Sequence, residues 1–324
     1  MDYLKYIISL LILAVIGIIY DNFKLHYDND EIRQYELVKK YLLSDSTLAR
    51  TKKPLLWIHT DPKTNSRWWE SFGSRNTDCL NQPYKLLCIK TILLKNTNDF
   101  NVCLIDDNSF TDIIPGWDID LNFIASPIKE KIRKIAMAKL LKNYGGFILP
   151  SSFICFTSLK PLYNLSTSYD KMFVAELDLN NGQGPRTNIV ESFIYPSSNM
   201  MGCRKNCASM DEYIHFLTIL TSSDYTDESN FLGQEKIWFL TNKDKINIIP
   251  PKFIGAMDER GKIISIEQLM GNIFINIDRR AFGIYIPDQE ILRRTKYNWF
   301  ARMNAKQVME SDTLIGKLLI INQH

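Results

Sequence analysis

Residues 128–150, with the sequence IKEKIRKIAMAKLLKNYGGFILP, decide the fold. Apolar residues recur from Met137 to Tyr144 at the i, i+3, i+4, i+7 spacing of one helix face, and Gly145 follows as a natural C-terminal cap. The next four residues, Gly146–Leu149, form a short apolar run that is typical of a buried strand. This stretch therefore predicts a helix from Ile128 to Tyr144 that leads directly into a strand.

Two more apolar runs of strand length precede this unit. Leu55–Ile58 follows Pro54, and Val102–Ile105 lies beyond a helix-compatible segment, Pro83–Lys95. Strands that alternate with helices indicate a mostly parallel sheet with helices covering both faces. We therefore expect an α/β domain in which these two runs and Gly146–Leu149 are neighbouring or near-neighbouring strands.

The second half of the chain is less regular. Lys171–Leu177 predicts another strand, and Met210–Leu220 and Gly233–Leu240 predict helices. The segment Ile246–Ile286 is rich in strand-forming residues, and the basic, aromatic segment Tyr297–Met309 is compatible with a terminal helix.

An apolar stretch near the N-terminus has the length of a membrane span. The residues from Tyr6 to Tyr20 are almost all aliphatic, and extension to Phe23 gives about 20 residues, enough to cross a hydrocarbon layer of about 30 Å. A cleaved signal peptide is the alternative, but it requires small residues before the cleavage site, and residues 16–21 offer only Gly17. We therefore expect an uncleaved anchor.

The anchor divides the chain into residues 1–23, a transmembrane signal anchor; residues 24–53, a charged stem; and residues 54–324, the α/β domain. Lys5 precedes the span and acidic residues follow it, which indicates a cytoplasmic N-terminus. The sequence thus predicts a single-pass membrane protein whose soluble domain is lumenal or external.

The composition excludes several classes of protein. With 45% hydrophobic and 12% aromatic residues, the 324-residue chain is not disordered in composition, and its net charge of +3 is not that of a nucleic-acid-binding protein. The six cysteines and four histidines have no metal-ligand spacing. The cysteines are compatible either with one or two disulfides or with buried free thiols.

The order of elements around Tyr144-Gly145-Gly146 resembles that of glycosyltransferases of the DXD sugar-binding and capsular-polysaccharide-synthesis type, over roughly residues 54 to 220. The resemblance implies a Rossmann-like glycosyltransferase A fold with a mixed, mostly parallel sheet, and a type II membrane protein. It also implies transfer of a hexose from a nucleotide sugar to a glycan or protein acceptor. In that family an Asp-x-Asp motif after the Gly-Gly strand holds a divalent metal on the donor diphosphate.

The sequence departs from that family at the metal motif. Pro150 and Ser152 stand where the two aspartates are expected, with Ser151 between them, and Lys134 and Met137 stand where the family has Asp and Arg on the preceding helix. Serine hydroxyls are poor ligands for hard cations, so we expect no metal or other cofactor at this turn.

Ligands of open α/β sheets bind beyond the carboxyl ends of the strands, so we expect the binding residues at or near these strand ends. The expected nucleotide-sugar-binding residues are Trp57, Ile58, His59, Asp106, Asp107, Gly145, Gly146, Ser151 and Ser152. Two alternatives remain open. The strand that ends in His59 could supply only core residues, and the two aspartates could serve only as turn and helix-cap residues.

Two catalytic candidates complete the site. Arg133 could stabilise the donor diphosphate in place of a metal, and Glu235 could act as general base for an acceptor hydroxyl. The alternatives are a solvated basic helix face and an ordinary glutamate at a helix start. The sequence therefore supports two functions, a membrane-anchored glycosyltransferase or a catalytically inactive scaffold with the same fold in a virion or membrane assembly. The oligomeric state stays open.

Overall fold

The computed structural model describes residues 53–61, 82–179, 194–223 and 228–323. The chain divides into two compact units, Met1–Arg50 and Thr51–His324, and every described residue belongs to the second. The predicted span at residues 6–20 and nearly all of the predicted stem lie outside the described residues. In the part of the chain that is described, no helix combines the length and the apolarity needed to cross a membrane.

A six-stranded sheet in the order β2-β1-β3-β6-β5-β7 forms the centre of the domain. Its strands are β1 (Leu55–His59), β2 (Asn101–Ile105), β3 (Gly146–Pro150), β5 (Met172–Leu179), β6 (Ile194–Cys203) and β7 (Ile246–Ile249). β1 is parallel to both β2 and β3, and β5 is parallel to β7, whereas β6 is antiparallel to its neighbours β3 and β5. The sheet is therefore mixed and mostly parallel, and the predicted neighbourhood of the first three apolar runs is confirmed.

The register brings the carboxyl ends of three strands to one level. His59, the last residue of β1, lies opposite Ile105 of β2 on one side and opposite Pro150 of β3 on the other. Side chains that follow these residues are therefore neighbours at this edge of the sheet, which is the edge where α/β proteins bind ligands.

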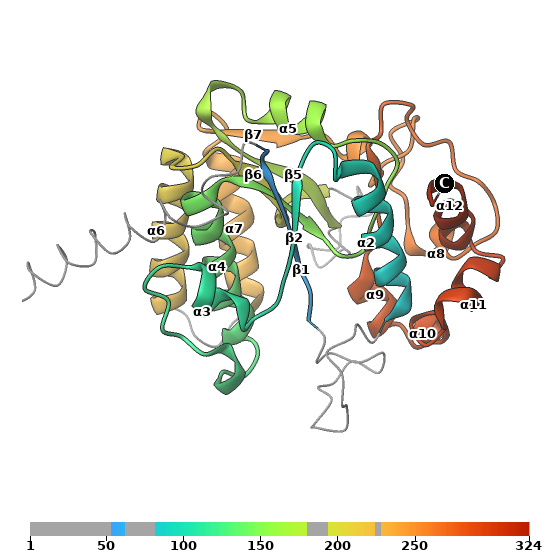
Figure 1. Cartoon of the computed structure of the whole chain (residues 1–324), viewed down its shortest axis with the longest axis horizontal. Coiled ribbons are helices and arrows are strands. Elements are labelled where there is room, and N and C mark those ends of the chain that lie inside the picture. Colours follow the sequence, from blue (N-terminus) through green and yellow to red (C-terminus); the bar gives the residue numbers. More distant parts are fainter. Residues whose placement is uncertain (1–52, 62–81, 180–193, 224–227, 324) are drawn as a thin grey trace, which may run out of the picture. The chain divides into compact units, whose positions relative to one another are not determined.

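Helices cover both faces of the sheet, as Figure 1 shows. The main ones are α2 (Pro83–Asn96), α4 (Ile128–Tyr144), α6 (Ala208–Ser223) and α7 (Glu228–Thr241). α4, α6 and α7 lie on one side, and α2 and the C-terminal helix α12 (Leu314–Asn322) lie on the other. The predicted helix over Ile128–Tyr144 is confirmed, and α6 and α7 contain the two helices predicted for the second half.

Two apolar clusters stabilise this arrangement. One lies between the sheet and α2 and includes Leu56, Ile92, Phe147 and Phe173, all less than 5% exposed. The other lies beneath the C-terminal helices and includes Leu319, next to the two-stranded sheet of β4 (Phe153–Cys155) and β8 (Gly283–Tyr285). Shorter helices between these elements are α3 (Ser109–Ile113), η1 (Leu121–Phe123), α5 (Lys160–Ser166), η2 (Ser168–Asp170) and α9 (Asp288–Arg293).

Two predictions for the C-terminal part were confirmed only in part. The segment 246–286, predicted to be rich in strands, contains β7 and β8 at its two ends. Between them the described chain forms η3 (Pro251–Ile254), α8 (Ile266–Leu269), an isolated bridge between Met257 and Ile263, and loops, because most of its apolar residues pack into the core. The expected terminal helix over 297–309 is broken into η4 (Thr295–Tyr297), α10 (Asn298–Ala301) and α11 (Ala305–Glu310). The break is explained by Asn304, which caps a new helix in a capping box with Gln307.

All five cysteines that the structure describes are free thiols, and four of them are buried.

Candidate functional site

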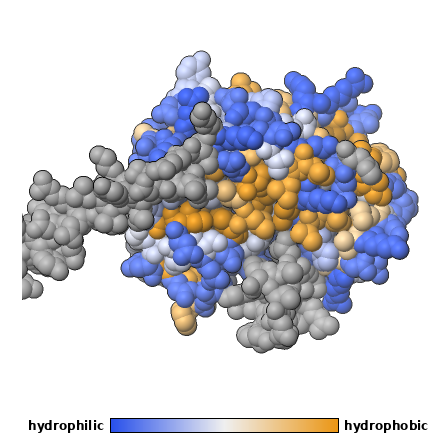
Figure 2. Space-filling view, viewed as in Figure 1, coloured by the Kyte–Doolittle hydropathy of each residue, from blue (hydrophilic) through white to orange (hydrophobic). Residues whose placement is uncertain are grey.

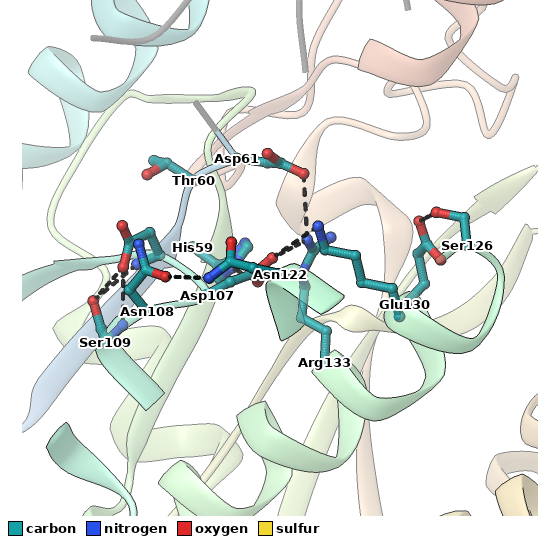
Figure 3. A network of polar contacts seen from close by, with 12 residues as sticks. His59, Thr60, Asp61, Asp107, Asn108, Ser109, Asn122, Ser126, Glu130 and Arg133 are labelled. Atoms are coloured by element: carbon teal, nitrogen blue, oxygen red, sulfur yellow. Dashed lines mark hydrogen bonds and ion pairs between the residues drawn. The ribbon is translucent and has the colours of Figure 1, made fainter. Parts of the chain in front are cut away.

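A charged cluster centred on Asp107 occupies the carboxyl edge of β1 and β2 (Figure 3). Arg133 on α4 donates two hydrogen bonds to this carboxylate, from Nε to Oδ1 at 2.7 Å and from Nη2 to Oδ2 at 2.6 Å. His59 Nε2 lies 2.9 Å from Asp107 Oδ1. The fork of the guanidinium matches the two oxygens of the carboxylate, so the pair fixes the end of β2 against α4.

Two more charged groups flank this pair. Arg133 Nη2 also lies 3.3 Å from Asp61 Oδ2, just beyond β1, and Lys129 Nζ lies 3.6 Å from Asp107 Oδ2. The ring of His59 is stacked on Phe110 with 5.7 Å between centroids. The cluster thus contains two lysine or arginine cations, two carboxylates and one imidazole.

Asp107 is held in its ionised form. Burial by itself would raise the pKa of Asp107, but hydrogen bonds from His59 and Arg133 outweigh burial and hold that pKa well below its usual range. Burial would lower the pKa of Arg133, and the hydrogen bonds to Asp107 reverse this and raise it. With side chains only 18% and 12% exposed, Arg133 and Asp107 form a partly desolvated ion pair.

Asp106 has a different role from its neighbour. Its Oδ1 accepts hydrogen bonds from Ser109 N at 2.9 Å and from Ser109 Oγ at 2.7 Å, and its own N–H donates to Ser109 Oγ at 3.1 Å. These bonds close the turn that leads into α3, so turn chemistry accounts for the contacts of this aspartate.

Trp57 and Ile58 lie in the core, and both are 0% exposed. The indole Nε1 of Trp57 donates to the carbonyl oxygen of Gly145 at 2.9 Å. The ring therefore ties β1 to the turn between α4 and β3, and neither side chain reaches the edge at which His59 lies.

Gly145 and Gly146 occupy positions that exclude side chains. Both have positive φ, 70° and 112°, and a Cβ on Gly146 would lie 2.4 Å from the carbonyl oxygen of Leu55. A Cβ on Gly145 would lie 2.7 Å from the backbone nitrogen of Lys205. The two glycines allow α4 to turn sharply and β3 to approach β1 closely.

The Pro150-Ser151-Ser152 turn presents only neutral side-chain oxygen donors. Ser152 is 1% exposed, and its Oγ donates to the carbonyl oxygen of Ile286 at 2.8 Å. Its hydroxyl thus links the turn to the chain that follows β8, while Ser151 is half-buried. The neutral donors of this turn do not fit Mg²⁺ or Mn²⁺, and in the ranges that the structure describes no three Asp, Glu, His or Cys side chains are grouped to hold a metal.

Glu235 belongs to a second charged cluster, built on α7. Its Oε2 lies 2.5 Å from Lys134 Nζ, and its Oε1 accepts a hydrogen bond from Tyr213 OH at 2.5 Å. The Glu235 side chain is only 4% exposed. Nearby, burial raises the pKa of Asp178, and Lys236, 3.8 Å away, opposes that shift.

The structure therefore divides the predicted site residues into three groups. His59, Asp107 and Arg133 come together, Glu235 lies in a separate cluster, and the others are in the core or in turns. Asp61 and Lys129 were missed, because only the folded sheet edge brings residues of β1, β2 and α4 together. For Lys134, the sequence offers one indication of a special role: it stands where the glycosyltransferases that the chain resembles have an aspartate.

Comparison with known proteins gave remote similarities only. No family model matches the chain, and no curated protein matches it either. Among solved structures, the apo form of the glycosyltransferase GlyE of Streptococcus pneumoniae is similar, with 14% identity and a TM-score of 0.37 over 62% of this chain and 46% of GlyE. A second GlyE structure has 11% identity and a TM-score of 0.41 over 84% of this chain and 64% of GlyE. The chain thus spans less than two thirds of either GlyE chain.

Proposed function

We propose that the chain is a glycosyltransferase that binds a nucleotide sugar at the carboxyl edge of β1 and β2 without a divalent metal. The observation that carries this proposal is the position of Arg133, whose guanidinium is fixed by Asp107 at the edge where α/β sheets bind ligands. Its Nε and Nη2 make those bonds, and its Nη1 has no bond to any residue that the structure describes.

The chemistry of the transfer requires a cation and a base. The acceptor oxygen forms a new bond to the sugar carbon as the bond from that carbon to the diphosphate breaks, and the electrons of the broken bond remain on phosphate oxygen. Arg133, with Lys129 beside it, would stabilise the resulting negative charge. The acceptor hydroxyl loses its proton to a carboxylate, for which Glu235 is the candidate. His59 and Asp61 at the end of β1 would contact the nucleoside.

The remaining elements of the proposal come from the sequence. Residues 6–20 would anchor the protein in a membrane, with the soluble domain lumenal or external. The acceptor would then be a glycan or a protein on that side of the membrane.

A second function, an inactive scaffold with the same fold, is favoured by a specific observation. The whole residue Glu235 is 3% exposed. Its carboxylate is bound to Lys134 and Tyr213, so it stabilises the packing of α4 against α6 and α7. Ser152 is likewise buried and bonded within the domain. In a scaffold these contacts would be the whole role of both residues.

A binding experiment distinguishes the two functions. The thermal midpoint of the full chain is measured with UDP- and GDP-sugars, once in Mn²⁺ and once in EDTA. A donor at 100 times its dissociation constant adds about 2.7 kcal/mol to the stability of the folded state, which is easily resolved. We expect at least one nucleotide sugar to raise the midpoint in EDTA as much as in Mn²⁺.

Variants test whether the site is the one proposed. Arg133→Ala should abolish the shift, whereas Lys90→Ala, which removes an exposed lysine on α2, should leave it unchanged. A shift that disappears in EDTA, or that survives Arg133→Ala, would contradict a metal-free site at Arg133. If no nucleotide sugar shifts the midpoint in either condition, the scaffold is the correct function.

A further inference from the structure

The edge strand β2 leaves one side of its backbone open. β2 is the first strand of the sheet and pairs only with β1 among the described strands. Asn101 N donates to Pro54 O at 3.0 Å, and Thr60 N donates to Ile105 O at 2.9 Å. Since alternate residues of a parallel strand face the same neighbour, Asn101, Cys103 and Ile105 bond to β1. Val102 and Leu104 therefore direct their N–H and C=O groups away from the sheet.

The surface along this edge is apolar. Leu104 is 56% exposed, and Leu86 and Leu94 on the adjacent helix α2 are 54% and 50% exposed. Figure 2 shows an apolar band on this face of the molecule, over β2 and α2. β2 contains no charged residue, proline or bulge, which are the features that protect edge strands from pairing. An open apolar edge of this kind is a site for an additional strand.

We propose that β2 pairs antiparallel with β2 of a second copy of this chain, around a two-fold axis that passes beside Cys103. Cys103 is the middle residue of Asn101–Ile105, so this register gives the two strands their greatest overlap. Val102 then lies opposite Leu104 of the copy, and each such pair exchanges both backbone hydrogen bonds, because both residues face outward. A shift by one residue would place outward-facing residues opposite inward-facing ones and remove these bonds.

The properties of β2 favour a second copy as the occupant. The strand is complementary to itself in hydrogen bonding, and self-pairing brings no like charges together because the strand is uncharged. A two-fold interface uses the same surface on both chains and is therefore closed at two copies. The two sheets would become one continuous sheet, and because the strands are antiparallel, the two Asp107 clusters would lie at its opposite edges. Each cluster stays complete within its own chain.

The register makes a covalent test possible. The backbone N–H and C=O groups of Cys103 point to β1 of their own chain, so the Cys103 residues of the two copies form a non-hydrogen-bonded pair across the two-fold axis. The Cα atoms of such a pair are about 4.5 Å apart, within the range that a disulfide tolerates. The full chain carrying Cys79→Ser is oxidised with diamide, which takes one proton and one electron from each of the two thiols as the S–S bond forms. We expect a disulfide-linked dimer that reducing agent dissolves and that Cys103→Ser abolishes. The other described cysteines, Cys88, Cys155, Cys203 and Cys207, are buried.

A charge placed on the edge tests the same pairing without covalent chemistry. Sedimentation equilibrium of the full chain in mild detergent should show twice the mass of one chain. Leu104→Lys should weaken association at least about tenfold, since a lysine on an edge strand opposes pairing. Leu165→Lys, which changes a similarly exposed leucine on α5, should leave association unchanged.

Three results would overturn the proposal. The first is a full chain that stays monomeric at tens of micromolar. This result is also expected if another strand of the same chain already pairs with β2. The second is an equal effect of Leu104→Lys and Leu165→Lys. The third is a cross-linked dimer that persists in Cys103→Ser.

Discussion

Replacement of Asp107 by asparagine tests the cluster at the sheet edge most directly. The side chain keeps its shape but loses its charge, and the amide nitrogen that replaces one carboxylate oxygen is itself a donor. At most two of the three hydrogen bonds that Arg133 and His59 donate are therefore kept, and these go to a neutral oxygen. Hydrogen bonds to charged groups contribute about 1 kcal/mol more than neutral ones, and Arg133 is left partly buried without its counter-ion. We therefore expect Asp107→Asn to lower the free energy of unfolding by about 3 kcal/mol. The midpoint should fall by about 6–12 °C.

The pH dependence of this loss has a definite sign. The pKa of Asp107 is lower in the folded protein than the value of about 3.9 in an unfolded chain. A depressed carboxyl pKa stabilises the folded state above the unfolded value, and this stability is lost as the pH falls toward the folded value. The difference between wild type and Asp107→Asn should thus be full at pH 7 and should shrink below about pH 4.

Urea denaturation followed by circular dichroism, at pH 7 and at steps down to pH 3, measures both quantities. Asp118→Asn is the matched control, because Asp118 is exposed in the loop after α3 and its replacement should change stability by less than about 0.5 kcal/mol. A loss below about 1 kcal/mol at pH 7, or a loss that does not change with pH, would refute the inference that the ionised carboxylate stabilises this edge.

Two further predictions concern packing, and both are measured by urea denaturation. Gly146→Ala should cost about 3–5 kcal/mol or prevent folding, because its Cβ would lie 2.4 Å from Leu55 O at a φ of 112°. Gly233→Ala, in a helix with open space around it, should instead stabilise by up to about 1 kcal/mol, and equal effects would contradict this account. Lys134→Met should cost about 3–5 kcal/mol because it leaves the buried carboxylate of Glu235 without its cation. Glu235→Gln added to that variant should recover part of the loss, and a further loss would argue against a buried charge.

The sequence predicted the elements whose signal is local. The helix over Ile128–Tyr144 and the three apolar strand runs were predicted correctly, because apolar periodicity and a glycine cap act within a few residues. The parallel pairing of β1 with β2 and β3 followed from the alternation of strands and helices. The same signals failed between β7 and β8, where most apolar residues pack into the core rather than into a sheet.

The polar contacts could be predicted only in part. The bond between Lys134 and Glu235 joins residues 101 positions apart, and nothing local to either residue specifies the other. The ends of β1 and β2 were expected to meet, but the approach of α4 that brings Arg133 to Asp107 depends on how the helix packs on the sheet. The antiparallel insertion of β6 between β3 and β5 is likewise a long-range choice.

The tight turn after α4 bears on how such chains are sorted by sequence. Gly145 and Gly146 lack side chains because the backbones of Leu55 and Lys205 leave no room for a Cβ. A Gly-Gly pair at this point therefore reports that a helix, two strands and a loop converge there. A protein with this fold needs the Gly-Gly pair whether or not it transfers sugars, so the pair identifies the fold and not the activity. Sorting related chains by activity has to use the side chains at the sheet edge instead.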